Sequence, residues 1–129
     1  MRRFLIALAA IAGLAGAASA QDAAVGIWQT EPDDGAFAHV VIAPCGNAFC
    51  GTIQRTFNAD GEYQSENIGK QIVIDMVPMG AGAYEGRVWR PSNDKIYVGK
   101  MTVNGNALRL QGCVAGGLIC ASQNWVRAG

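Results

Sequence analysis

The chain has 129 residues, half of them hydrophobic, and its ten basic side chains balance its ten acidic ones to a formal net charge of zero. Nucleic-acid binding requires lysine and arginine side chains clustered on one surface, and this sequence shows no such cluster. The composition therefore argues against a nucleic-acid binder and fits one small globular domain.

The first twenty residues have the pattern of a secretory signal peptide. Arg2 and Arg3 precede the apolar run FLIALAAIAGLAGA, which leads to Ala-Ser-Ala. This pattern predicts cleavage after Ala20. The run is shorter than the roughly 20 apolar residues of a spanning helix, so we expect no membrane span in the mature protein. The prediction is a signal peptide over residues 1–20, one domain over residues 21–129, and a periplasmic or secreted location.

Eight segments of the domain are rich in apolar and β-branched residues, and short turns of Gly, Asn, Asp and Pro separate them. In chain order they are VGIWQT, AFAHVVIAP, FCGTIQRTF, KQIVIDMV, AYEGRVWRP, KIYVGKM, ALRLQGC and LICASQNWVR. No stretch shows sustained helical periodicity. Eight short strands in one domain predict an all-β fold, either an up-and-down barrel or a β-sandwich.

Four cysteines flank two of the predicted turns: Cys45 and Cys50 enclose GNAF, and Cys113 and Cys120 enclose VAGGLI. A hairpin centred midway between the members of each pair places them directly opposite each other. In an oxidising compartment an even number of cysteines favours disulfides. We therefore predict the bridges Cys45–Cys50 and Cys113–Cys120. We predict no metal site, because a single histidine is a poor additional zinc ligand, and no redox site, because Cys-x-x-Cys is absent.

Alternation along the hairpins assigns an inward and an outward face. In the hairpin of the first cysteine pair, Val40 and Ile42 share the core face. In the last hairpin, Leu108, Gln123 and Trp125 point inward. Both disulfides come out on the solvent side. The only histidine, His39, does so too, and it is interpreted as an exposed surface imidazole.

The two ends of the domain carry matching motifs. Gly26 and Trp28 lie in GIW on the first strand, and Arg127 ends WVR on the last. A closed barrel brings these strands side by side, and an Arg guanidinium on an indole face is worth about 0.5–2 kcal/mol. The pattern resembles the calycin superfamily of lipocalins and their relatives. That resemblance implies an eight-stranded antiparallel up-and-down barrel in which Arg127 covers Trp28 as a structural pair.

A wider resemblance covers almost the whole domain. Its blocks are Gly26 and Trp28, the CGNAFCG hairpin, an Asp-Gly loop leading to Asn67, EGRVWRP followed by KIYVGKM, and LRLQGCVAGGLICASQNWVR. In order and spacing they are similar to the secreted bacterial family called domain of unknown function 2147. The resemblance implies a fold and a compartment, and it brings no biochemical activity with it.

Catalytic chemistry has little support in the residue pattern. The cysteines are predicted to be paired, His39 is predicted to face outward, and no Gly-x-Ser-x-Gly motif occurs. The carboxylates of the turns, including the loop NADGEYQSEN, are interpreted as solvated turn residues rather than as an acid–base pair or a calcium site. We therefore expect no enzyme activity, no catalytic residues and no cofactor.

Two non-enzymatic functions then compete. An eight-stranded barrel holds either packed side chains or one small molecule. The first candidate function is binding of a small apolar ligand by Trp28, Tyr84, Gln123 and Trp125, although the aromatics alternatively fill a dry core. A cavity of roughly 300 Å³ or more would favour the ligand.

The second candidate function is that of a protein-binding module, such as a periplasmic protease inhibitor that inserts the lead-in QDAAVG into an enzyme. Finding that segment ordered against the barrel would count against it.

Trp89 is a separate candidate for a protein contact. If Val88 faces the core, alternation exposes Trp89 between Arg87 and Arg90. An exposed tryptophan flanked by arginines has the composition of an interaction hot spot. The opposite register would bury the indole instead.

Overall fold

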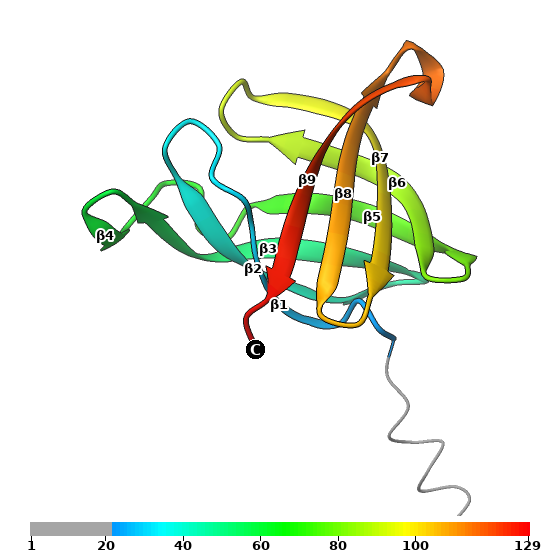
Figure 1. Cartoon of the computed structure of the whole chain (residues 1–129), viewed down its shortest axis with the longest axis horizontal. Coiled ribbons are helices and arrows are strands. Elements are labelled where there is room, and N and C mark those ends of the chain that lie inside the picture. Colours follow the sequence, from blue (N-terminus) through cyan, green and yellow to red (C-terminus); the bar gives the residue numbers. More distant parts are fainter. Residues whose placement is uncertain (1–21) are drawn as a thin grey trace, which may run out of the picture.

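The computed structural model describes residues 22–129, whose regular secondary structure is almost entirely β-strand (Figure 1). The predicted signal peptide lies outside the described residues. Within them the elements are β1 (Gly26–Gln29), β2 (Phe37–Cys45), β3 (Ala48–Asn58), β4 (Gly61–Tyr63), β5 (Gln71–Gly80), β6 (Ala83–Arg90), β7 (Lys95–Asn104), β8 (Ala107–Val114), the short 3-10 helix η1 (Ala115–Gly117) and β9 (Ile119–Arg127). A search of this part of the chain for a helix long and apolar enough to cross a membrane finds none.

Eight of the strands form a closed antiparallel barrel. Their order is β2-β1-β9-β8-β7-β6-β5-β3, and pairing of β2 with β3 closes the ring. This confirms the predicted eight-stranded barrel over the β-sandwich. The ninth strand, β4, pairs only with the end of β3 and projects from the barrel (Figure 1). Sequence reasoning treated its segment as a turn because three exposed residues give no alternation to detect.

The core follows the predicted inward faces in most strands. Val40, Ile42, Leu108 and Trp125 are buried, as alternation indicated. In β5 the alternation breaks, because Ile72 and Val73 are both buried. The pairing of β5 shifts its register on both sides, against β3 and against β6, and these irregularities explain the break.

Both predicted disulfides are present, Cys45–Cys50 and Cys113–Cys120. The second pair lies directly opposite, as expected. The predicted register of the first pair is wrong by two residues, because Cys45 pairs across the ladder with Ala48 rather than with Cys50. A two-residue hairpin turn needs a positive φ at its centre, and a glycine at position 46 with φ +66° supplies it.

The prediction that both bridges face solvent is wrong for one cysteine of each pair. Cys50 and Cys113 are buried, whereas Cys120 is exposed. Cys113 lies between Val98 of β7 and Cys120 of β9, so neighbouring strands cover both of its flanks.

Candidate functional site

One end of the barrel is closed by the predicted tryptophan–arginine pair. Trp28 is fully buried, and the guanidinium carbon of Arg127 lies 4.2 Å from the centre of its ring. The two residues are directly paired across β1 and β9. Gly26 permits this approach, because its φ is +141° and a Cβ there would lie 2.6 Å from Nη1 of Arg127. The contact predicted between Arg127 and Trp28 is therefore present in the structure.

The segment that precedes β1 completes this closed end. Arg127 donates hydrogen bonds to the carbonyl oxygens of Ala23, at 2.9 Å, and Val25, at 3.1 Å. The Trp28 indole donates to the carbonyl oxygen of the fully buried Ala24 at 2.9 Å. The chain before the first strand is therefore folded against the barrel floor.

Tyr84 belongs to the same closed end. Its hydroxyl donates to a carboxylate oxygen of Asp22, which also accepts the backbone N–H of Ala24 at 2.8 Å. Burial, together with the Asp22 carboxylate, raises the pKa of Tyr84 far above its usual range. Tyr84 therefore stays neutral and acts as a hydrogen-bond donor to the floor segment.

The opposite half of the barrel encloses a cavity of about 510 Å³. Six strands contribute apolar side chains to its wall, among them Ala38, Ile53, Ile72, Val88, Leu110 and Trp125. The cavity also reaches the last residues of β6 and the loop before β2, so it opens away from the floor. A volume of this size and an apolar lining match small-molecule sites in proteins, which typically span about 300–1,000 Å³.

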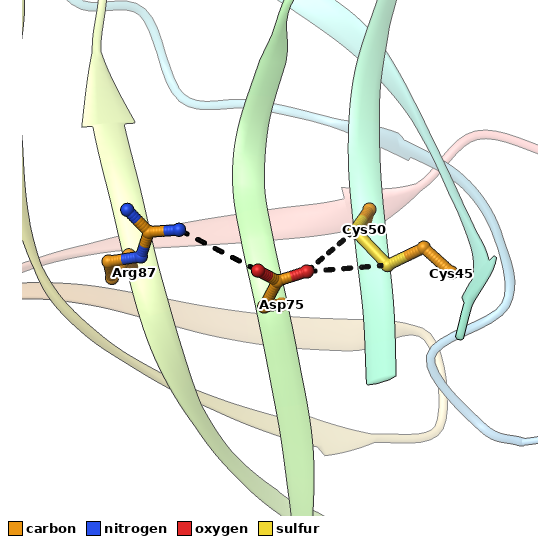
Figure 2. The surroundings of a disulfide bond; sticks show 4 residues. All are labelled: Cys45, Cys50, Asp75 and Arg87. Atoms are coloured by element: carbon orange, nitrogen blue, oxygen red, sulfur yellow. Dashed lines mark hydrogen bonds and ion pairs between the residues drawn. A yellow bond between two sulfur atoms is a disulfide. The ribbon is translucent and has the colours of Figure 1, made fainter. Parts of the chain in front are cut away.

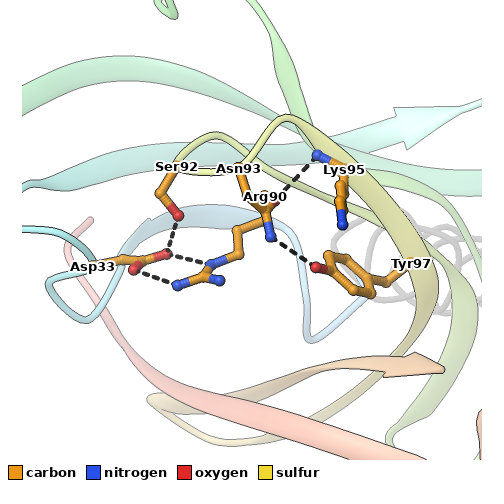
Figure 3. A network of polar contacts seen from close by, with 6 residues as sticks. All are labelled: Asp33, Arg90, Ser92, Asn93, Lys95 and Tyr97. Carbon is orange, nitrogen blue, oxygen red and sulfur yellow. Dashed lines mark hydrogen bonds and ion pairs between the residues drawn. The ribbon is translucent and has the colours of Figure 1, made fainter.

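Charged residues at the mouth form one compact network (Figure 3). Arg90 donates from Nε and Nη2 to the two carboxylate oxygens of Asp33, each at 2.9 Å, and Ser92 donates to the same carboxylate at 3.2 Å. The hydrogen bond from Arg90 is the main cause of a lowered pKa at Asp33. Beside it, the Asn93 amide donates to the Tyr97 hydroxyl at 2.8 Å. The mouth is thus a paired, polar rim around an apolar interior.

Other polar residues of the cavity lining are uncharged. Gln123 accepts the indole N–H of Trp125 through its side-chain oxygen at 2.8 Å. Thr30 accepts the backbone N–H of Ala38 at 3.0 Å, and Thr56 donates to the carbonyl oxygen of Tyr63. All of these residues line the cavity.

The structure divides the four predicted ligand-binding residues between the two halves of the barrel. Gln123 and Trp125 line the cavity, whereas Trp28 and Tyr84 lie outside its lining and build the floor. Alternation correctly gives the side of a strand on which a residue lies, but it does not give the height along the barrel. Sequence reasoning missed Ile72 because of the irregular pairing of β5, and it missed the Asp33–Arg90 pair because the partners are 57 positions apart.

The exposed position predicted for Trp89 is wrong. Val88 is buried as assumed, yet Trp89 is half-buried, packs against the core and lines the cavity. Its indole donates to Asp94 at 2.9 Å, and the Lys70 ammonium lies 5.6 Å from its ring centre. The flanking Arg90 is held by Asp33, so Trp89 and Arg90 do not have the exposed arrangement that the hot-spot candidate requires.

His39 lies on β2, outside the cavity lining, and is half-buried rather than exposed. Its Nε2 is 3.1 Å from the side-chain oxygen of Gln29, and its ring packs against Phe57. Partial burial, followed by the charge of Arg55, lowers the pKa of His39. These contacts account for the imidazole without a catalytic partner.

Within residues 22–129, one group of metal-ligand side chains comes close together: Cys45, Cys50 and Asp75. The two cysteines are joined in a disulfide, so neither offers a thiolate to a metal (Figure 2).

Comparisons with known proteins identify a family and support the barrel fold. The model of a family described as uncharacterized proteins conserved in bacteria, DUF2147, matches residues 26–127. No protein of curated function matches the sequence significantly. Among solved structures, the chain is similar to protein HP1028 from Helicobacter pylori, which is described as belonging to the lipocalin family. The TM-score is 0.62 at 18% identity, covering 82% of this chain and 83% of that one.

A second solved structure in the comparison is fatty-acid-binding protein 1 from Echinococcus granulosus. Its TM-score is 0.49 at 10% identity, covering 84% of this chain and 100% of that one. At these identities the two likenesses say nothing about the ligand, and the first supports a lipocalin-like fold.

Proposed function

This chain belongs to the DUF2147 family, and from that premise we propose that it is a non-enzymatic protein that binds one small apolar molecule. The observation that carries the proposal is the cavity of about 510 Å³, open at one end and closed at the other. Such a volume exceeds the roughly 300 Å³ at which a ligand becomes a better explanation than a dry core. The ligand enters through the mouth, because Arg127 and the segment before β1 close the floor.

The binding site we propose combines Gln123 and Trp125 with the apolar wall residues around them. Trp125 lines the cavity, and its indole N–H is already satisfied by Gln123. Trp28 and Tyr84 contribute indirectly by supporting the floor. Of the four residues predicted from the sequence to bind a ligand, we therefore assign direct contact to Gln123 and Trp125.

A non-enzymatic role is supported by the state of the reactive side chains. All four cysteines are in disulfides, and the one histidine contacts Gln29 and Phe57 outside the cavity. We also propose a periplasmic or secreted location. Two disulfides support it, because such bonds form and persist in oxidising compartments.

The protease-inhibitor alternative is not favoured by the structure. An inhibitor of the kind considered needs its N-terminal lead-in free to enter an enzyme cleft. Here Ala24 is fully buried, and the carbonyl oxygens of Ala23 and Val25 are engaged by Arg127. Releasing this segment would open the barrel floor, so ligand binding is the function we propose.

The test is native mass spectrometry of protein purified from the periplasm, with the neutral dye N-phenyl-1-naphthylamine added to protein that carries no ligand. We expect either a co-purifying apolar molecule or uptake of one dye molecule. Ala38→Phe fills the cavity from β2 and should abolish the added mass. The matched control Ala43→Phe adds the same group at an exposed position of β2 and should retain it.

Thermal unfolding of both variants establishes that they are folded. A wild-type protein that carries no added mass and takes up no dye would overturn the proposed function. Uptake by Ala38→Phe equal to that of the wild type would show that the dye binds elsewhere, which would remove the cavity from the proposal.

A further inference from the structure

The charges around the cavity restrict the chemical class of its ligand. In the part of the chain that the structure describes, the charged side chains of the lining are Glu31, Asp33 and Arg90. Two are negative and one is positive. An anionic ligand would therefore have only Arg90 as a partner within the lining.

Arg90 is already paired with Asp33 through its Nε and Nη2 groups. Two parallel N–H···O bonds of 2.9 Å form the planar fork that carboxylates and guanidinium groups prefer. Ser92 holds the same carboxylate in place at 3.2 Å (Figure 3). A ligand carboxylate that took Arg90 would leave the Asp33 charge unpaired and close to its own, so the exchange is unfavourable.

The other charged residues near the cavity do not supply a cationic partner for an anionic ligand. Glu31 accepts the backbone N–H of Asn124 and adds a second negative charge at the rim. Lys70 lies outside the lining, is exposed, and holds its ammonium 5.6 Å from the centre of the Trp89 ring. Its charge is solvated, and salt screens such exposed groups.

The interior instead offers donors that suit an uncharged acceptor. Because the oxygen of Gln123 accepts from Trp125, its amide N–H groups are left to donate, and no partner for them appears among residues 22–129. Thr30 accepts from Ala38, which leaves its hydroxyl hydrogen to donate. A hydroxyl or carbonyl oxygen on an apolar molecule would satisfy these donors without bringing in a charge.

Building on the proposed function, we propose that the cavity selects uncharged amphiphiles over fatty-acid-type anions: molecules with an apolar body that ends in a hydroxyl, ester or amide oxygen. Burying an ionised carboxylate without a cationic partner is strongly unfavourable, whereas burying an alcohol that finds a hydrogen bond is tolerated. The Asp33–Arg90 pair thereby acts as a specificity determinant at the mouth.

The experiment compares 1-decanol with decanoate, which each contain ten carbons in a straight chain and differ in charge at neutral pH. Affinities are measured by displacement of N-phenyl-1-naphthylamine, with intrinsic tryptophan fluorescence as a second signal. We expect decanol to bind at least about tenfold more tightly than decanoate. Asp33→Asn keeps the shape of the side chain and removes its charge. It should free Arg90 and raise decanoate affinity about tenfold, with little change for decanol.

The matched control is Glu62→Gln. It removes the acidic partner of another arginine fork, Arg55–Glu62, whose two members lie outside the cavity lining. It changes the net charge by the same amount as Asp33→Asn and should leave decanoate affinity unchanged. An equal rise in both variants would overturn the inference, because general surface charge would then explain the effect.

The remaining outcomes separate the two proposals. If decanoate binds the wild type as tightly as decanol does, the inference about ligand class falls while the proposed function stands. If neither compound binds and the dye does not bind either, both fall. Thermal unfolding of Asp33→Asn confirms that a lost signal does not come from an unfolded protein.

Discussion

Asp75 occupies an unusual position beside the Cys45–Cys50 bridge (Figure 2). Its Oδ1 lies 3.6 Å from the sulfur of Cys50 and 3.9 Å from that of Cys45. The sulfurs of a disulfide carry no hydrogen, so the contact is electrostatic rather than a hydrogen bond. On its other side the carboxylate faces Arg87 at 3.6 Å, and both side chains of that pair are more than half exposed. The negative charge is therefore only partly compensated.

We expect Asp75→Asn to accelerate reduction of the Cys45–Cys50 bridge by dithiothreitol. The attacking species is a thiolate, and two unit charges about 4 Å apart in water repel by about 1 kcal/mol, or about fivefold in rate. Asparagine also tolerates the positive φ of this position, +49°, so the backbone should be preserved. Mass spectrometry of alkylated samples follows the reaction. The Cys113–Cys120 bridge is the internal control, and an equal acceleration there would contradict the explanation.

Residue identity alone could predict the disulfides but not the position of Asp75. The pairing of the cysteines follows from their spacing, their number and the turns between them. Asp75 takes its place because the pairing of β5 with β6 is irregular at this point. That irregularity depends on Gly86 across the ladder, where a Cβ would lie 2.5 Å from the carbonyl oxygen of Asp75. Alternation assumes a regular ladder, so it cannot anticipate this arrangement.

At the scale of elements, the role of residues 22–25 was the hardest to predict from the sequence. Only the last of them, Val25, falls in a predicted strand, and sequence reasoning gave the segment either no role of its own or that of an inhibitory lead-in. In the structure it covers the barrel floor, with Asp22 bound to Tyr84, 62 positions further along the chain. Local patterns cannot reveal a contact made over such a separation, whereas the regular strands on either side of each turn were predictable.

We expect the Asp22–Tyr84 contact to contribute measurably to stability. Tyr84→Phe should lower the free energy of unfolding by about 1 kcal/mol, because it removes one hydrogen bond to a charged acceptor and keeps the ring. Asp22→Ala should cost somewhat more, since it also removes the acceptor for Ala24. Urea denaturation of both single variants and of the double variant measures the coupling. Strictly additive losses would show that the two side chains do not interact in solution.

At the scale of the whole molecule, the barrel was predictable and the cavity was not. Eight apolar segments with short turns, together with motifs at both ends, predict a closed ring of strands and the Trp28–Arg127 pair. The cavity depends on how much volume the inward side chains of six strands leave unfilled, which no single segment specifies. Gln123 and Trp125 were selected for facing inward, and so were Trp28 and Tyr84. Only the three-dimensional register separates the pair at the cavity from the pair at the floor.

Because Arg127 belongs to the floor of the barrel, we expect its removal to lower the stability of the fold. Arg127→Ala removes the stacking on Trp28 and the hydrogen bonds to Ala23, Val25 and Gly105. Stacking of this kind is worth about 0.5–2 kcal/mol and each hydrogen bond about 1 kcal/mol, so we expect a loss of at least about 2 kcal/mol in the free energy of unfolding. Arg127→Lys keeps the charge without the planar fork and should recover only part of it.

Ligand binding should depend on Arg127 far less than stability does, because the floor and the mouth are at opposite ends of the barrel. The affinity of folded Arg127→Ala for N-phenyl-1-naphthylamine should stay within about twofold of the wild type, measured well below its unfolding temperature, since Arg127 is not part of the cavity lining. Ala38→Phe should show the reverse, with lost binding and little loss of stability. If Arg127→Ala stays folded yet loses the dye, the floor must take part in ligand entry or contact, and the assignment of entry to the mouth would be wrong.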